Sequence, residues 1–178
     1  QYLPIKLSGT GIRIPANLSW CNSLVRKVES YGLEEDDYLY LTAKHLWVGT
    51  NKGNRLGWHS DGFLTEDINY LWYDSIPTEF CVQEFTLTPD HTTSVKEMGL
   101  QATQDNIITY PNKHLLRLDQ AVIHRVSPEE FEGMRTFVKL SVSKDKYNLK
   151  GNAHNELFDY HWTMLPRSKS RNDPVGKA

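Results

Sequence analysis

The chain has 178 residues, of which 39% are hydrophobic and 11% aromatic, enough to bury the core of one domain and to exclude bulk disorder. A net charge of −2 and a pI near 6.4 give no overall basic field, so duplex nucleic acid is not a favoured partner. Two cysteines and the lack of an apolar run of about 20 residues predict a cytoplasmic protein that does not enter the membrane.

One amphipathic helix is predicted near the start, after a short strand and loop. Leu18, Cys21, Val25 and Val28 recur at helical spacing within residues 17–31. Asn17 or Ser19 would cap this helix and Gly32 would end it.

Short strands with turn signals between them are predicted for most of the remaining chain. They cover residues 38–42, 45–48, 56–61, 69–73, 79–87, 106–110, 115–118, 121–126 and 136–143. This pattern predicts a single, mainly β domain over residues 1–165, built as a sandwich, barrel or jelly roll with flanking helices. Residues 166–178 are polar and basic, which predicts a flexible tail.

The segment GWHSDGF, residues 57–63, contains the first chemical signal. His59 and Asp61 stand two positions apart. On a strand they would share one face, so that an imidazole and a carboxylate could converge on one point. Gly57 and Gly62 flank the pair and allow the backbone to bend.

A third ligand and a cation follow later in the chain. His124 ends an apolar strand, and Arg135 stands eleven positions further on in the next strand. Two histidines and one carboxylate are the facial triad of non-haem iron(II) oxygenases. A guanidinium is suited to bind a carboxylate through two hydrogen bonds.

This ordered set resembles the 2-oxoglutarate- and Fe(II)-dependent oxygenase superfamily, with its prolyl-hydroxylase-like and AlkB-like members. The resemblance covers roughly residues 38–143 and implies a double-stranded β-helix (jelly-roll, cupin-like) core. It implies that His59, Asp61 and His124 bind Fe(II) and that Arg135 holds the distal carboxylate of the cosubstrate 2-oxoglutarate. The implied activity is hydroxylation or demethylation of a C–H group, with O2 consumed and succinate and CO2 released.

Two positions depart from the pattern of that superfamily. The strand before the turn reads HLWVGT, where many members carry an Asn or Tyr, and Arg135-Thr136-Phe137 replaces the frequent R-x-S. A hydroxyl for the cosubstrate must therefore come from elsewhere, and Tyr70 and Tyr110 are the candidates.

Two alternatives stay open on the sequence. One is a non-catalytic jelly-roll binding module, and the other is a cupin-like enzyme that uses a different metal. The substrate is not specified by the triad. A small molecule, an amino acid or peptide, or a nucleobase would suit a chain of this size, and residues 63–79 and 88–105 are the segments expected to select it.

Overall fold

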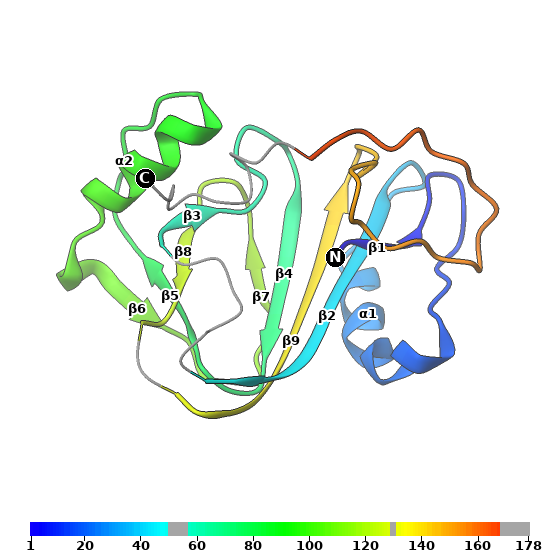
Figure 1. The fold of residues 1–178 in the computed structure, drawn as a ribbon, viewed down its shortest axis with the longest axis horizontal. Helices are drawn as coiled ribbons and strands as arrows, with labels where there is room; N and C mark the ends of the chain where they lie inside the picture. Colours follow the sequence, from blue (N-terminus) through cyan, green and yellow to red (C-terminus); the bar gives the residue numbers. More distant parts are fainter. Residues whose placement is uncertain (50–56, 129–130, 168–178) are drawn as a thin grey trace.

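The computed structural model describes residues 1–49, 57–128 and 131–167. It is mainly β, as the sequence predicts, with two antiparallel sheets and two short α-helices (Figure 1). None of the helices in these ranges is long and apolar enough to cross a membrane.

The larger sheet has the strand order β1-β2-β9-β4-β7. Its strands are β1 (Leu3–Lys6), β2 (Tyr38–Val48), β4 (Ile68–Tyr73), β7 (Leu116–Leu118) and β9 (Gly133–Ser143). Strands β2 and β9 pair along their whole length, from Tyr38 opposite Ser143 to Val48 opposite Gly133. This long two-stranded ribbon forms the centre of the larger sheet, and β4 pairs with the other edge of β9.

The smaller sheet has the order β3-β8-β5-β6. Its strands are β3 (His59–Ser60), β5 (Thr78–Cys81), β6 (Ile107–Thr109) and β8 (Ile123–Val126). Here the predicted strands were too long. Of residues 57–61, the described part of the predicted strand 56–61, only two are in β3, and of residues 79–87 only the first three are in β5.

Alternation along the strands separates an outer from an inner face of the larger sheet. Val138 and Leu140 on β9 face outward, into a core shared with Val25 and Val28 of helix α1 (Asn22–Glu29). Leu71 on β4 faces inward, where it packs with other residues from both sheets. The inward side chains of β9 are therefore every second residue from Arg135 to Ser143.

The helices differ in two ways from the prediction. The predicted helix over residues 17–31 is a 3-10 helix, Ala16–Cys21, followed by α1, and neither has a side-chain cap. A second helix, α2 (His91–Gln101), lies within residues 88–105, where the sequence predicts neither helix nor strand, and the Asp90 carboxylate caps it by accepting from the backbone N–H groups of Thr92 and Thr93. Helix α2 buries Met98 against the outer face of the smaller sheet, beside Trp58 and Ile123.

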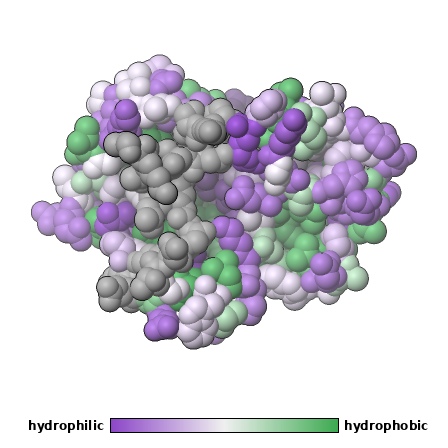
Figure 2. All heavy atoms as spheres, viewed as in Figure 1, coloured by the Kyte–Doolittle hydropathy of each residue, from purple (hydrophilic) through white to green (hydrophobic). Residues whose placement is uncertain are grey.

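The last part of the chain runs back past β1 and β2, in orange to red in Figure 1. Its Arg167 donates to the side chain of Asn152, so this residue of the predicted tail contacts the domain. From residue 168 on, the predicted tail lies outside the described residues. Hydrophilic and hydrophobic residues are interspersed on the face seen in Figure 2.

Candidate metal centre

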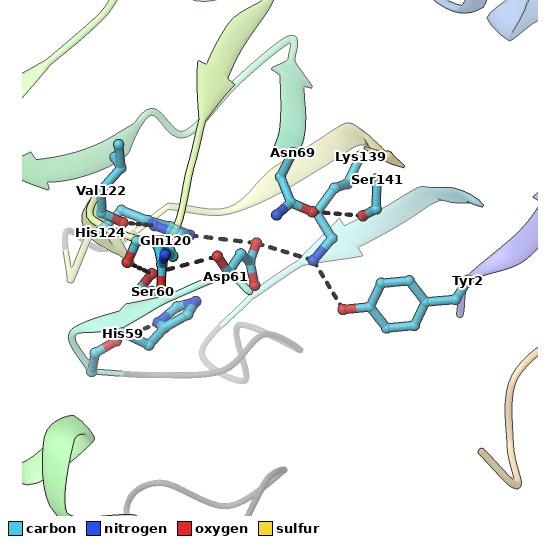
Figure 3. A network of polar contacts seen from close by, with 11 residues as sticks. Tyr2, His59, Ser60, Asp61, Asn69, Gln120, Val122, His124, Lys139 and Ser141 are labelled. Atoms are coloured by element: carbon cyan, nitrogen blue, oxygen red, sulfur yellow. Dashed lines mark hydrogen bonds and ion pairs between the residues drawn. The ribbon is translucent and has the colours of Figure 1, made fainter. Parts of the chain in front are cut away.

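His59, Asp61 and His124 come together on the inner side of the smaller sheet (Figure 3). His59 on β3 stands directly opposite His124 on β8 in the antiparallel pair, which places both side chains on one face. Their ring centroids are 4.5 Å apart. Asp61 follows β3 two positions after His59, so the spacing predicted from the sequence brings its carboxylate to the same side.

One ligand atom from each of the three residues lies within 4.8 Å of the others. Two donors at about 2.1 Å from one metal lie on the order of 3 Å apart when they meet at a right angle. Side-chain rotation can bring the ligand atoms from within 4.8 Å of one another to that shorter spacing. His59 and His124 are buried, whereas the Asp61 side chain keeps 19% of its surface exposed and gives the cluster an opening.

Nδ1 of each imidazole lies within hydrogen-bond distance of a backbone carbonyl, which orients the ring. His59 Nδ1 lies 2.9 Å from the oxygen of Gly57, and His124 Nδ1 lies 3.1 Å from the oxygen of Val122. A carbonyl only accepts, so Nδ1 carries the hydrogen and Nε2 carries the lone pair. This is the arrangement by which proteins present Nε2 to a metal. The donor set of two imidazoles and one carboxylate therefore fits Fe(II) or a similar divalent ion.

A tight turn positions Asp61. Gly62 has a φ of +72°, and a Cβ there would lie 2.9 Å from Oγ1 of Thr65 and 3.0 Å from Cβ of Asp67. Glycine is thus required by conformation and by space. Gly57, on the other side of the motif, also has a positive φ, of +88°.

On the opposite face of the smaller sheet, contacts among Trp58, Arg125 and Glu79 support β3 and β8, the strands next to the ligands. Trp58 is buried and faces away from His59, as strand alternation predicts. The Arg125 guanidinium lies 4.3 Å from the centre of its ring and also binds Glu79 on β5, with Nε at 2.7 Å from the carboxylate. Three strands of the smaller sheet are therefore tied together directly behind the ligands.

The sequence reasoning missed Lys139, which touches the triad. Its ammonium lies 3.0 Å from Oδ2 of Asp61 and 3.0 Å from the hydroxyl of Tyr2. Burial alone would raise the pKa of Asp61, but the charge of Lys139 and the neighbouring imidazoles of His124 and His59 outweigh it and hold that pKa well below its ordinary value. Lys139 is on the same face of β9 as Arg135, four residues on, and this spacing is the signal in the sequence that could have identified it.

Arg135 is buried further along the same inner face, with 3% of its surface exposed. Its guanidinium donates to the carbonyls of Ser75 and Ile76 and lies 5.8 Å from the centre of the Tyr73 ring. Lys44, opposite Phe137 on β2, faces the same interior. Burial lowers the pKa of Lys44, and the nearby charges of Lys139 and Arg135 lower it further. Within the described residues, Arg135, Lys139 and Lys44 thus carry basic groups on the inner face, and of these Lys139 contacts the triad.

The two candidate tyrosines, Tyr70 and Tyr110, lie in different parts of the structure. Tyr70 stands opposite Leu140 on the outer face of β4 and stacks on Tyr31, with ring centroids 5.5 Å apart. The structure therefore does not bring Tyr70 to the triad, because it lies on the wrong side of the strand. Tyr110 is partly exposed at the margin of the interior, where its ring meets that of Phe80 at 5.4 Å, and Phe80 in turn lies 6.0 Å from His124.

Tyr73 is a buried tyrosine of β4 that is not among the candidates named from the sequence. It is three residues after Tyr70 on β4, so it takes the inner face, opposite Phe137. Its hydroxyl donates to the carbonyl of Tyr110, at 3.4 Å.

Comparison of the chain with protein-family profiles, with curated proteins and with solved structures gave no significant match.

Proposed function

We propose that the two sheets form a double-stranded β-helix, or jelly roll. The support is the order of pairing along the eight strands that begin with β2. The first pairs with the last, β2 with β9, and the pairs then run inward as β3 with β8, β4 with β7 and β5 with β6. A ribbon of paired strands folded in this way gives two facing sheets with a narrow interior.

We infer that the protein is an Fe(II)- and 2-oxoglutarate-dependent dioxygenase that hydroxylates or demethylates a C–H group of its substrate. The observation that carries this proposal is the convergence of His59, Asp61 and His124 within that interior. Bound there, iron would supply the activation of O2 at the expense of 2-oxoglutarate. The three residues leave the other positions around the metal for cosubstrate and O2.

The cations of the interior support the cosubstrate assignment. 2-Oxoglutarate carries one carboxylate at each end of a short carbon chain. Arg135 is four residues along β9 from Lys139, the lysine that contacts Asp61 of the triad. Arg135 gives two N–H groups to carbonyls, and a guanidinium has five in all. We assign the distal carboxylate to Arg135, with the Tyr73 hydroxyl beside it and Lys44 between the two ends.

The protein's own contribution is positioning and exclusion of water. The carbonyls of Gly57 and Val122 fix the imidazoles, and the turn at Gly62 fixes the carboxylate. Phe80 and Phe137 place apolar surface between the sheets, next to the charged groups. A largely dry interior strengthens the hold of each cation on a bound carboxylate.

The substrate is proposed as a small molecule, an amino acid or peptide, or a nucleobase, because the interior is narrow and the chain carries no overall basic field. Residues 63–79, which begin two positions after Asp61, and residues 88–105 remain the segments that we propose to select it.

One observation favours the alternative of a binding module without metal chemistry. Lys139 already neutralises Asp61, so the cluster is electrostatically satisfied without an ion. Under that alternative the interior cations would bind an anionic ligand and the histidines would have a purely structural role.

The experiment that separates these readings is succinate formation from 2-oxoglutarate by the purified protein with Fe(II), ascorbate and O2. A low rate of 2-oxoglutarate turnover above the iron-only blank is the expected result. His59→Ala and Asp61→Ala should lose it, and Arg135→Met should keep the metal but require at least tenfold more 2-oxoglutarate. A rate that survives both triad substitutions would refute the proposal.

A further inference from the structure

Lys139 is a buried cation in contact with a metal-ligand carboxylate. Only 8% of its surface is exposed, and its ammonium lies between Asp61 on one side and Tyr2 on the other (Figure 3). The Tyr2 ring also faces it, with the ammonium 4.9 Å from the ring centre. These contacts hold the charge inside the protein, next to the point where a metal would bind.

The ion pair uses one oxygen of the carboxylate. Lys139 Nζ lies 3.0 Å from Oδ2 of Asp61, and His124 Nε2 lies 3.7 Å from the same atom. Neither contact involves Oδ1. A lysine bound in this way keeps the Asp61 side chain turned toward the histidines, in the conformation that a metal needs.

The same charge opposes the metal. A divalent ion that binds His59, Asp61 and His124 comes close to the Lys139 ammonium, and like charges in a medium of low dielectric repel strongly. The Lys139 ammonium lies 3.0 Å from Oδ2 of Asp61 and 3.0 Å from the Tyr2 hydroxyl, and both contacts favour the charged form of the side chain.

We propose that Lys139 is the internal counter-ion of Asp61, which stabilises the metal-free protein and which an incoming metal must oppose. Lys139 is thus a positioning residue, and its presence makes metal binding weaker and more readily reversible than the triad alone would give. The proposal rests on the metal centre proposed above.

The test measures metal affinity and stability rather than turnover. Calorimetric titration with Mn(II), a divalent ion that takes the same ligands without oxidation, is compared for wild type, Lys139→Met and Lys139→Arg. Lys139→Met should unfold at a lower temperature than wild type without metal, because Asp61 loses its partner, and should bind Mn(II) at least tenfold more tightly. Lys139→Arg keeps the charge and should remain closer to wild type. Equal or weaker Mn(II) binding by Lys139→Met would overturn the proposal.

A second measurement covers the case in which Lys139→Met does not fold. Thermal unfolding of metal-free wild type, Asp61→Asn, Lys139→Met and the double variant forms a mutant cycle. The double variant removes both charges, so it should be more stable than either single variant. Additive losses, or a double variant that is the least stable, would contradict the counter-ion role.

The two proposals fail in different ways. If neither wild type nor Lys139→Met binds Mn(II), the metal centre and the effect of Lys139 on it are both refuted. The cycle is measured without metal, and additivity there would overturn the counter-ion role even in a protein that binds Mn(II).

Discussion

At the scale of single residues, the triad is the part of the site that the sequence predicts best. The spacing of His59 and Asp61 constrains both side chains to one face, and the order of His124 and Arg135 adds two further constraints. Tyr70 and Tyr110 were the predicted hydroxyls, and Tyr70 lies on the outer face, because a strand covered on both faces by apolar groups does not reveal in its sequence which face is inner. Tyr73 has the same side chain on the other face.

The interior lysines were missed for a related reason. A charged residue that alternates with apolar ones usually indicates the solvent face of a strand. Lys139 alternates with Val138 and Leu140 on β9, but both faces of this strand are covered, and the lysine faces the interior. Its partner Asp61 is 78 residues away in the chain, so no local pattern reports the pairing.

The pair Tyr73 and Tyr70 gives a matched prediction at this scale. Tyr73→Phe should raise the KM for 2-oxoglutarate by about tenfold or more, because it removes a hydroxyl beside Arg135 and a hydrogen bond to a charged group contributes about 1.5–3 kcal/mol. Tyr70→Phe removes the same atom on the outer face and should leave that KM unchanged. Steady-state succinate formation at varied 2-oxoglutarate measures both, and an equal response of the two variants would argue against the assigned cosubstrate site.

At the scale of elements, β3 shows why strand lengths were overestimated. Residues 56–61 alternate like a longer strand, yet only His59 and Ser60 pair with β8 before the chain turns at Gly62. Helix α2 was missed because its sequence, HTTSVKEMGLQ, has little contrast between faces and buries only Ser94 and Met98. Asp90, which caps it, was the available signal.

Gly62 and Gly32 provide a second matched prediction. Gly32 has a φ of +95°, and a Cβ added there would have no atom within 4 Å. Gly32→Ala should therefore lower the free energy of unfolding only by the strain of the left-handed backbone, about 1–2 kcal/mol. Gly62→Ala adds close contacts to Thr65 and Asp67 and should cost about 1–3 kcal/mol more.

Only the Gly62 substitution should also weaken metal binding, since it displaces the turn that holds Asp61. Urea unfolding gives the stability of each variant, and Mn(II) titration gives the affinity. An affinity loss that is the same in Gly32→Ala would mean that general destabilisation, and not the turn, is responsible.

At the scale of the whole molecule, the fold places its functional candidates inside and its helices outside. Helix α1 covers the outer face of the larger sheet, and α2 lies against the outer face of the smaller one. This leaves the space between the sheets for the triad and for the basic groups of Arg135, Lys139 and Lys44. The mainly β class was predictable from the alternation of short segments, whereas the pairing of distant strands depends on contacts that no short pattern encodes.

The most direct test of the account is an anaerobic titration of the protein with Fe(II) in the presence of 2-oxoglutarate, followed by visible absorption. A 2-oxo acid chelated to Fe(II) gives a weak charge-transfer band. The proposed metal centre predicts such a band, saturating at one equivalent of iron, reduced in Arg135→Met at limiting 2-oxoglutarate and lost in His124→Ala. A wild-type protein that shows no band and whose unfolding temperature Fe(II) does not raise would contradict the metal centre on which the proposed function stands.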